Sequence, residues 1–226
     1  MLSSYFSLNT LMELLCLITA IYCLHNDKQK VWRLIIVLLF ATYFAETFGR
    51  YIYMNKLAAS NHWVYNILLV VQVSIFHTMF AHLFRQYSIS KVPLLAGLAI
   101  LCIKYAYDIF TEGFWVFSQH TYTILSVLIV LYGFIFYYHL LTDDSYVDLR
   151  YSSAFWWVSG IMIFCFGSMA CNFFEERLNH VMVSGHHLSY YIFRVLNVFL
   201  YGFWAFSFIC RKWLSRAQGN IPSPRF

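Results

Sequence analysis

The chain has 226 residues, of which 61% are hydrophobic and only 11% are charged, and its mean hydropathy is +0.63. A water-soluble fold of this composition would lack polar surface, so the surroundings of the folded chain must be lipid. The formal charge of +5 does not indicate a nucleic-acid partner, because the basic residues gather at the ends of apolar runs instead of forming a patch.

Seven apolar runs follow one another along the chain, each long enough to cross about 30 Å of hydrocarbon as a helix. The predicted transmembrane helices cover residues 5–24, 34–54, 62–84, 92–110, 119–141, 153–174 and 189–210, and a basic tail covers 211–226. The first run lacks the basic region and cleavage site of a signal peptide, so it should remain as an anchor. We therefore expect one all-α domain over residues 1–226, an integral membrane bundle of about seven transmembrane helices.

The distribution of Lys and Arg predicts the orientation of this bundle, because cytoplasmic flanks retain basic residues. With the amino terminus outside, ten of them fall on the cytoplasmic side: Lys28, Lys30, Arg33, Arg85, Lys91, Arg150, Arg211, Lys212, Arg216 and Arg225. Only Lys56 and Arg177 then flank the outer side. We expect an outer amino terminus, a cytoplasmic carboxyl terminus and a place in the cell inner membrane.

Polar side chains at membrane depth are the candidate ligand-binding residues, since charges inside a bilayer usually face a protein interior or an aqueous cavity. The candidates are Glu13, Glu46, Arg50, Asn66, Lys104, Asp108, His120, Asn172, Arg194 and Asn197. In the predicted orientation the charged ones lie within roughly 12 Å of the outer helix ends at 1.5 Å per residue, and the others fall in the same layer. This pattern predicts a cup open to the outside, with Tyr and Trp in its lining and an apolar inner half.

A purely structural role for the same charges stays open. Two pairs are four residues apart on one helical face and could neutralise themselves: Glu46 with Arg50, and Lys104 with Asp108. Glu13 and Arg194 have no local partner of this kind. Because the first and last helices often adjoin in a seven-helix ring, we expect an ion pair between these two residues.

No metal site is predicted, and no cofactor is required by the sequence. His77 and His82 are five residues apart and do not share a helical face, and neither His-x-x-x-His nor His-Glu-x-x-His occurs. Axial ligation of haem by His77 and His139, from the third and fifth helices, is the cofactor alternative.

Three stretches carry a family resemblance: HWVYNILLVVQ at 62–72, FWWVSGIMIFCFGS at 155–168 and YYIFRVLNVFLYGFWAFSFICRKW at 190–213. Together they resemble a group of uncharacterised seven-helix Bacteroidota inner-membrane proteins, commonly encoded beside sensor histidine kinases. The resemblance implies a signalling context and supplies no catalytic residue.

These observations favour a receptor-like or sensory protein that binds a small molecule in the outer half of the bundle. Its signal would pass to a separate partner, a sensor kinase or another membrane protein, because the loops and the tail are too short for an output domain. One alternative is an intramembrane lipid-modifying enzyme using Glu46, Asp108 or His120 as acid or base. Further alternatives are a small-solute transporter, disfavoured by the unbroken helices, and a membrane scaffold that needs no ligand.

Overall fold

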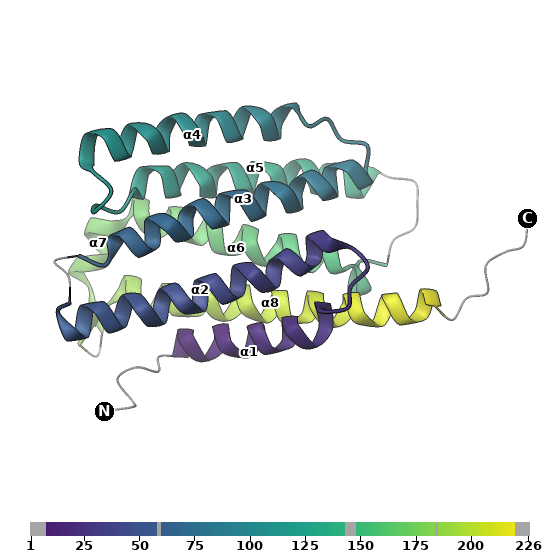
Figure 1. The fold of residues 1–226 in the computed structure, drawn as a ribbon, viewed down its shortest axis with the longest axis horizontal. Coiled ribbons are helices and arrows are strands. Elements are labelled where there is room, and N and C mark those ends of the chain that lie inside the picture. The colour runs from purple at the N-terminus through teal and green to yellow at the C-terminus, as the bar shows by residue number, and fades with distance from the viewer. Residues whose placement is uncertain (1–7, 58–59, 143–147, 184, 220–226) are drawn as a thin grey trace, which may run out of the picture.

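The computed structural model describes residues 8–57, 60–142, 148–183 and 185–219, most of which lie in helices. The long helices lie side by side and run alternately in opposite directions along the horizontal axis of Figure 1. The long helices are α1 (Leu8–Leu24), α2 (Lys30–Asn55), α3 (His62–Gln86), α4 (Val92–Glu112), α5 (Gln119–Thr142), α6 (Ser153–Phe173) and α8 (Leu188–Gly219). Each predicted range overlaps one of them, and α8 continues through much of the predicted tail. Residues 5–7 of the first predicted helix and 220–226 of the tail lie outside the described residues.

The bundle has the composition of a multi-pass membrane protein. Six of its helices, α2 to α6 and α8, are long and apolar enough to cross a membrane. The seventh predicted span corresponds to α1, whose 17 described residues reach about 26 Å, slightly less than the hydrocarbon core. The predicted all-helical, membrane-type fold is thus confirmed, with six candidate spans among the described residues.

Six of the helices close into a ring. Consecutive neighbours pack in the order α1, α2, α3, α5, α6 and α8, and α8 returns to α1. Close packing of α6 on α8 depends on small residues: a Cβ added at Gly167 would lie 2.5 Å from Leu196 Cδ2. Because the first and last helices are neighbours, residues far apart in the sequence meet across the ring.

Helix α4 stands outside this ring, against α3 and α5, at the edge of the bundle in Figure 1. Most of its surface is exposed and apolar, including Val92, Leu95, Ile103 and Phe110. A surface of this kind is expected of a helix that faces lipid.

One half of the ring is filled by large aromatic side chains. The fully buried ones are Trp32, Phe80, Phe84, Tyr132, Phe136, Trp157 and Phe208. They come from the end of α3, the beginnings of α2 and α6, and the later turns of α5 and α8, all of which meet at the same end of the bundle. Packing to the density of a protein interior leaves little free space in this half.

The polar segment between α6 and α8 is not a simple loop. It contains a short α-helix, α7 (Glu175–His180), and a hairpin in which β1 (Met182–Val183) pairs antiparallel with β2 (His186–His187). The fold class remains all-α, and this short hairpin is a local element that the sequence analysis did not predict. The pairing spans only two residues on each side, below the length at which alternating hydrophobicity identifies a strand. A second short element, η2 (Leu149–Tyr151), precedes α6.

Candidate functional site

A cavity of about 320 Å³ lies inside the ring, in the half that the large aromatic side chains leave open. All six ring helices contribute to its wall, together with Phe117 from the segment before α5. No residue of α4 lines it. Its size falls at the lower end of the range for small-molecule pockets.

Four helices each supply two polar residues four positions apart to the cavity wall. These are Asn9 and Glu13 on α1, Thr42 and Glu46 on α2, Tyr122 and Ser126 on α5, and Asn197 and Tyr201 on α8. Residues spaced by four lie one above the other on a helix face. Each helix therefore presents about one turn of polar surface to the same space.

Glu13 is the most deeply buried acid of the cavity, with 5% of its surface exposed. Its Oε1 accepts a hydrogen bond of 3.2 Å from the Tyr201 hydroxyl on α8. Its Oε2 is buried and has no hydrogen-bond partner among the described residues, and the same holds for Asn9 Oδ1 one turn earlier. Buried polar atoms normally have a partner, so these two acceptors are exceptions that need an explanation.

Two acids and one base interact electrostatically beside the cavity. Glu46 and Arg50 both act electrostatically on Glu13, and all three act on the Tyr65 hydroxyl. Arg50 also acts on Glu46, four residues earlier on α2. Glu13 and Glu46 line the cavity, whereas Arg50 does not. The wall, as far as the structure describes it, contains no Lys, Arg or His side chain.

The floor of the cavity is apolar. Leu38, Phe76, Ile129, Ile161 and Trp204 line it at the level where the buried aromatic cluster begins. The Trp204 ring stacks on Trp157 at a centroid distance of 6.0 Å, and its Nε1 donates to the Trp157 carbonyl oxygen at 3.2 Å. A ligand here would meet a polar upper wall and an apolar lower one.

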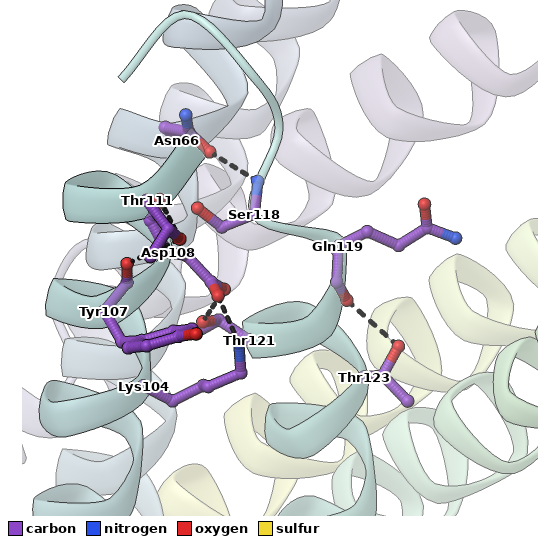
Figure 2. Close-up of polar contacts among 9 residues, drawn as sticks. All are labelled: Asn66, Lys104, Tyr107, Asp108, Thr111, Ser118, Gln119, Thr121 and Thr123. Carbon is purple, nitrogen blue, oxygen red and sulfur yellow. Dashed lines mark hydrogen bonds and ion pairs between the residues drawn. The ribbon is translucent and has the colours of Figure 1, made fainter. Parts of the chain in front are cut away.

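Lys104 and Asp108 do not reach this cavity, because α4 stands outside the ring. They form the ion pair expected from their spacing, and Asp108 Oδ2 also accepts a 2.7 Å hydrogen bond from Thr121 on α5 (Figure 2). Asp108 is 2% exposed. With both of its oxygens engaged, this carboxylate fastens α4 to the beginning of α5.

The side chain of Asn66 is also engaged in hydrogen bonds within the protein. Its Nδ2 donates to the carbonyl oxygens of Phe114 and Val116, both at 2.8 Å, and its Oδ1 accepts from the Ser118 backbone N–H at 3.1 Å. Figure 2 shows the contact with Ser118. Asn66 therefore holds the segment between α4 and α5. His120 is exposed and Asn172 partly buried, and neither is in the cavity wall.

The expected ion pair between Glu13 and Arg194 is wrong. Arg194 stacks on the Tyr190 ring at 4.4 Å, and its Nε is buried without a hydrogen-bond partner among the described residues. The two side chains lie at different heights along the bundle. Arg194 precedes Tyr201, the residue that contacts Glu13, by seven positions, or about 10 Å of helix rise. Helices α1 and α8 do adjoin, as expected, but a tyrosine fills the place given to the arginine.

Of the ten candidate residues, Glu13, Glu46 and Asn197 line the cavity. Sequence reasoning missed the other neutral polar residues of its wall: Asn9, Thr42, Tyr65, Gln72, Tyr122, Ser126 and Tyr201. The signal that could have identified several of them is the spacing of four from a charged or amide residue at membrane depth. Tyrosine gives little signal of its own in a chain with 18 of them.

The histidines lie apart from the cavity. His77 Nδ1 is 2.9 Å from the Val73 carbonyl oxygen, and its Nε2 is 3.4 Å from the Tyr132 hydroxyl. Both ring nitrogens are thus occupied, and axial ligation of haem would require one of these contacts to break. Across the described ranges no three His, Cys, Asp or Glu side chains come together as a metal site.

The opposite end of the ring has a tight ionic contact. Arg211 of α8 donates to Asp27, in the turn between α1 and α2, through Nε at 2.8 Å and Nη2 at 3.2 Å, and it stacks over Trp32 at 5.0 Å. Burial alone would raise the pKa of Asp27, but hydrogen bonds from Arg211 and the Gln29 backbone N–H bring that pKa below its usual value. This contact ties the far end of α8 to the α1–α2 turn.

Comparison of the chain with family models, with curated proteins and with solved structures gives no match. The functional argument therefore depends on the cavity and its side chains.

Proposed function

We propose that this protein is a receptor-like membrane protein that binds a small molecule in the ring cavity and passes a conformational signal to a separate partner. The observation that carries the proposal is the buried Glu13 side chain, which faces a cavity of about 320 Å³ with one carboxylate oxygen unpartnered. A purely structural acid would be expected to have both oxygens satisfied, as Asp108 has.

Helix α8 is the proposed route of the signal. It carries Tyr201, which holds Glu13, and ten residues later it carries Arg211, which holds Asp27. The two contacts are about 15 Å apart along one continuous helix. A ligand that competes for Glu13 would shift α8 and so change the contact at the other end. Such coupling requires that the ligand favour one arrangement of α8 over the other.

The proposal includes seven membrane crossings, with α1 as the first, an outer amino terminus and a cytoplasmic end of α8. Packing of α1 in the ring supports a spanning role, and the basic residues near the Asp27–Arg211 contact support a cytoplasmic location for that end. The cavity would then open toward the outer side of an inner membrane. The likeness of 62–72, 155–168 and 190–213 to proteins encoded beside sensor histidine kinases favours such a kinase as the partner.

The competing functions receive less support. The enzyme hypothesis names Glu46, Asp108 and His120, of which only Glu46 lines the cavity. For a transporter, the aromatic cluster around Trp157 closes the other half of the ring. For a scaffold, an open cavity with unpartnered acceptors has no use.

Native mass spectrometry of protein gently extracted from its own membrane tests the proposal. Wild type should retain a bound small molecule. Ser126→Phe should lose it, because Ser126 lines the cavity and is 2% exposed, so a phenyl ring there fills the site. The matched control is Ser74→Phe: this serine makes the same hydrogen bond to the carbonyl four residues back, but from an exposed helix face. Equal retention in both variants, or a bare wild-type protein that responds to no added molecule, contradicts the proposal.

A further inference from the structure

The upper wall of the cavity offers hydrogen-bond acceptors that lack donors. Glu13 Oε2 and Asn9 Oδ1 are both buried without a partner among the described residues, and both belong to one face of α1. A carboxylate or phosphate placed beside them would bring further acceptors and no donor. A protonated amine brings up to three donors and no acceptor, so it matches this wall.

The charge of the wall favours the same class of ligand. Glu13 and Glu46 are its two ionisable acids, and Arg50, outside the lining, acts on both of them. A bound ammonium would place a second positive charge, beside that of Arg50, next to the two carboxylates. Both acids could then be ionised without leaving an uncompensated buried charge, which would be costly.

The remaining walls define the rest of the ligand. Aromatic rings of Tyr65, Phe76, Tyr122, Phe193 and Trp204 line the cavity, and aromatic faces attract cations through their quadrupoles. The lower wall is aliphatic and aromatic, so it has no partner for a hydrated inorganic ion. It accommodates an apolar group instead.

We propose that the cavity takes an amphipathic organic cation: a small protonated amine whose ammonium group lies between Glu13 and Glu46 and whose apolar part lies toward Phe76 and Trp204. This inference rests on the proposed function and specifies its ligand class. The ammonium supplies the hydrogen-bond donor that Glu13 Oε2 lacks, and the apolar group displaces water from the floor of the cavity.

Three probes of the same shape and different charge test the ligand class. They are 2-phenylethylamine, its neutral counterpart 2-phenylethanol and the anion 3-phenylpropanoate, each titrated against wild-type protein in lipid nanodiscs by calorimetry. The amine should bind at least about tenfold more tightly than the alcohol, the cost expected for losing a charge-assisted hydrogen bond, and the anion should not bind.

Two substitutions locate the ammonium. Glu13→Gln and Glu46→Gln should each weaken amine binding by about tenfold or more while leaving binding of the alcohol nearly unchanged. Glu112→Gln, an exposed acid at the end of α4, is the control and should have no effect. Unfolding of each variant, followed by circular dichroism, identifies any that fail to fold. Because two acids are tested independently, the test remains valid if one of the two variants fails to fold.

The outcomes separate the ligand class from the function. Equal or tighter binding of the alcohol or the anion, lost in Ser126→Phe, overturns the cation proposal but retains the cavity as a ligand site. Amine binding that survives both Gln substitutions also overturns it. If none of the probes binds, the cation proposal is wrong, and the native mass spectra of wild type and Ser126→Phe then decide whether the cavity holds any small molecule.

Discussion

Two buried acids from the same polar layer differ in almost every respect that matters for function. Asp108 receives hydrogen bonds from Lys104 and Thr121, so both of its oxygens are satisfied. Glu13 receives one hydrogen bond, from Tyr201, and its second oxygen faces a cavity without a partner. In the sequence both are simply acids near one end of an apolar helix.

The difference teaches how to distinguish a structural charge from a functional one. A structural carboxylate lowers its burial cost by using every oxygen within the fold. An acid with an open oxygen beside a cavity leaves that cost for a ligand to offset. The position of the parent helix decides the outcome here, because α4 lies outside the ring and α1 is part of it.

The largest effect is expected at the satisfied acid. Asp108→Ala leaves the Lys104 ammonium without its partner and removes the tie to α5, so the free energy of unfolding should fall by about 3 kcal/mol. Unfolding in mixed detergent and SDS micelles measures this quantity. Glu112→Ala, on the same helix but exposed, should change it by less than about 0.5 kcal/mol. A similar loss of stability in Asp108→Ala and Glu112→Ala would show that Asp108 has no special structural role.

A second satisfied acid, Asp27, should behave in the same way outside the membrane. Asp27→Asn should cost about 2 kcal/mol, since it weakens two charge-assisted hydrogen bonds from Arg211. The pKa of Asp27 is lower in the folded protein than in the unfolded chain. Its contribution is therefore complete above the unfolded value, about pH 4, and is lost as the pH falls through the lower folded value.

Unfolding of wild type and Asp27→Asn as a function of pH checks this prediction. The stability difference between them should be constant near neutral pH and shrink in acid. The stability of Arg211→Gln should depend on pH less than that of wild type, as for Asp27→Asn, because this substitution removes the other half of the contact. A difference that grows as the pH falls would contradict the assigned direction.

A smaller effect is expected from the tie between α4 and α5 alone. Thr121→Val keeps the shape of the side chain but removes the 2.7 Å hydrogen bond to Asp108, which should cost about 1 kcal/mol. Thr123→Val is the matched control, since Thr123 donates only to the Gln119 carbonyl of its own helix (Figure 2). Equal stability of the two variants would mean that the Thr121 hydroxyl contributes nothing to holding Asp108.

Composition and hydropathy were sufficient to predict the helical, membrane-type bundle, because lipid allows few other folds and each span leaves a long apolar run. The spacing of four also identified the Lys104–Asp108 pair, a contact within one helix. These features depend on local sequence alone.

The arrangement of the helices could not be predicted from the sequence. Nothing in the composition of α4 distinguishes a helix outside the ring from one within it, so all seven predicted helices were given a polar residue facing the same pocket. Contacts between helices depend on their relative level as well, and an error of two turns replaced Tyr201 by Arg194 as the partner of Glu13. The hairpin of β1 and β2 was missed because two residues are too few to show a period.

The most direct test of the central claim compares Glu13→Gln with Asp108→Asn in one unfolding experiment. Glutamine keeps an acceptor for Tyr201 and removes a buried charge with an unpartnered oxygen, so Glu13→Gln should be as stable as wild type or more stable. Asp108→Asn should be clearly destabilised. If Glu13→Gln loses as much stability as Asp108→Asn, Glu13 is a structural acid and the cavity is not the functional site.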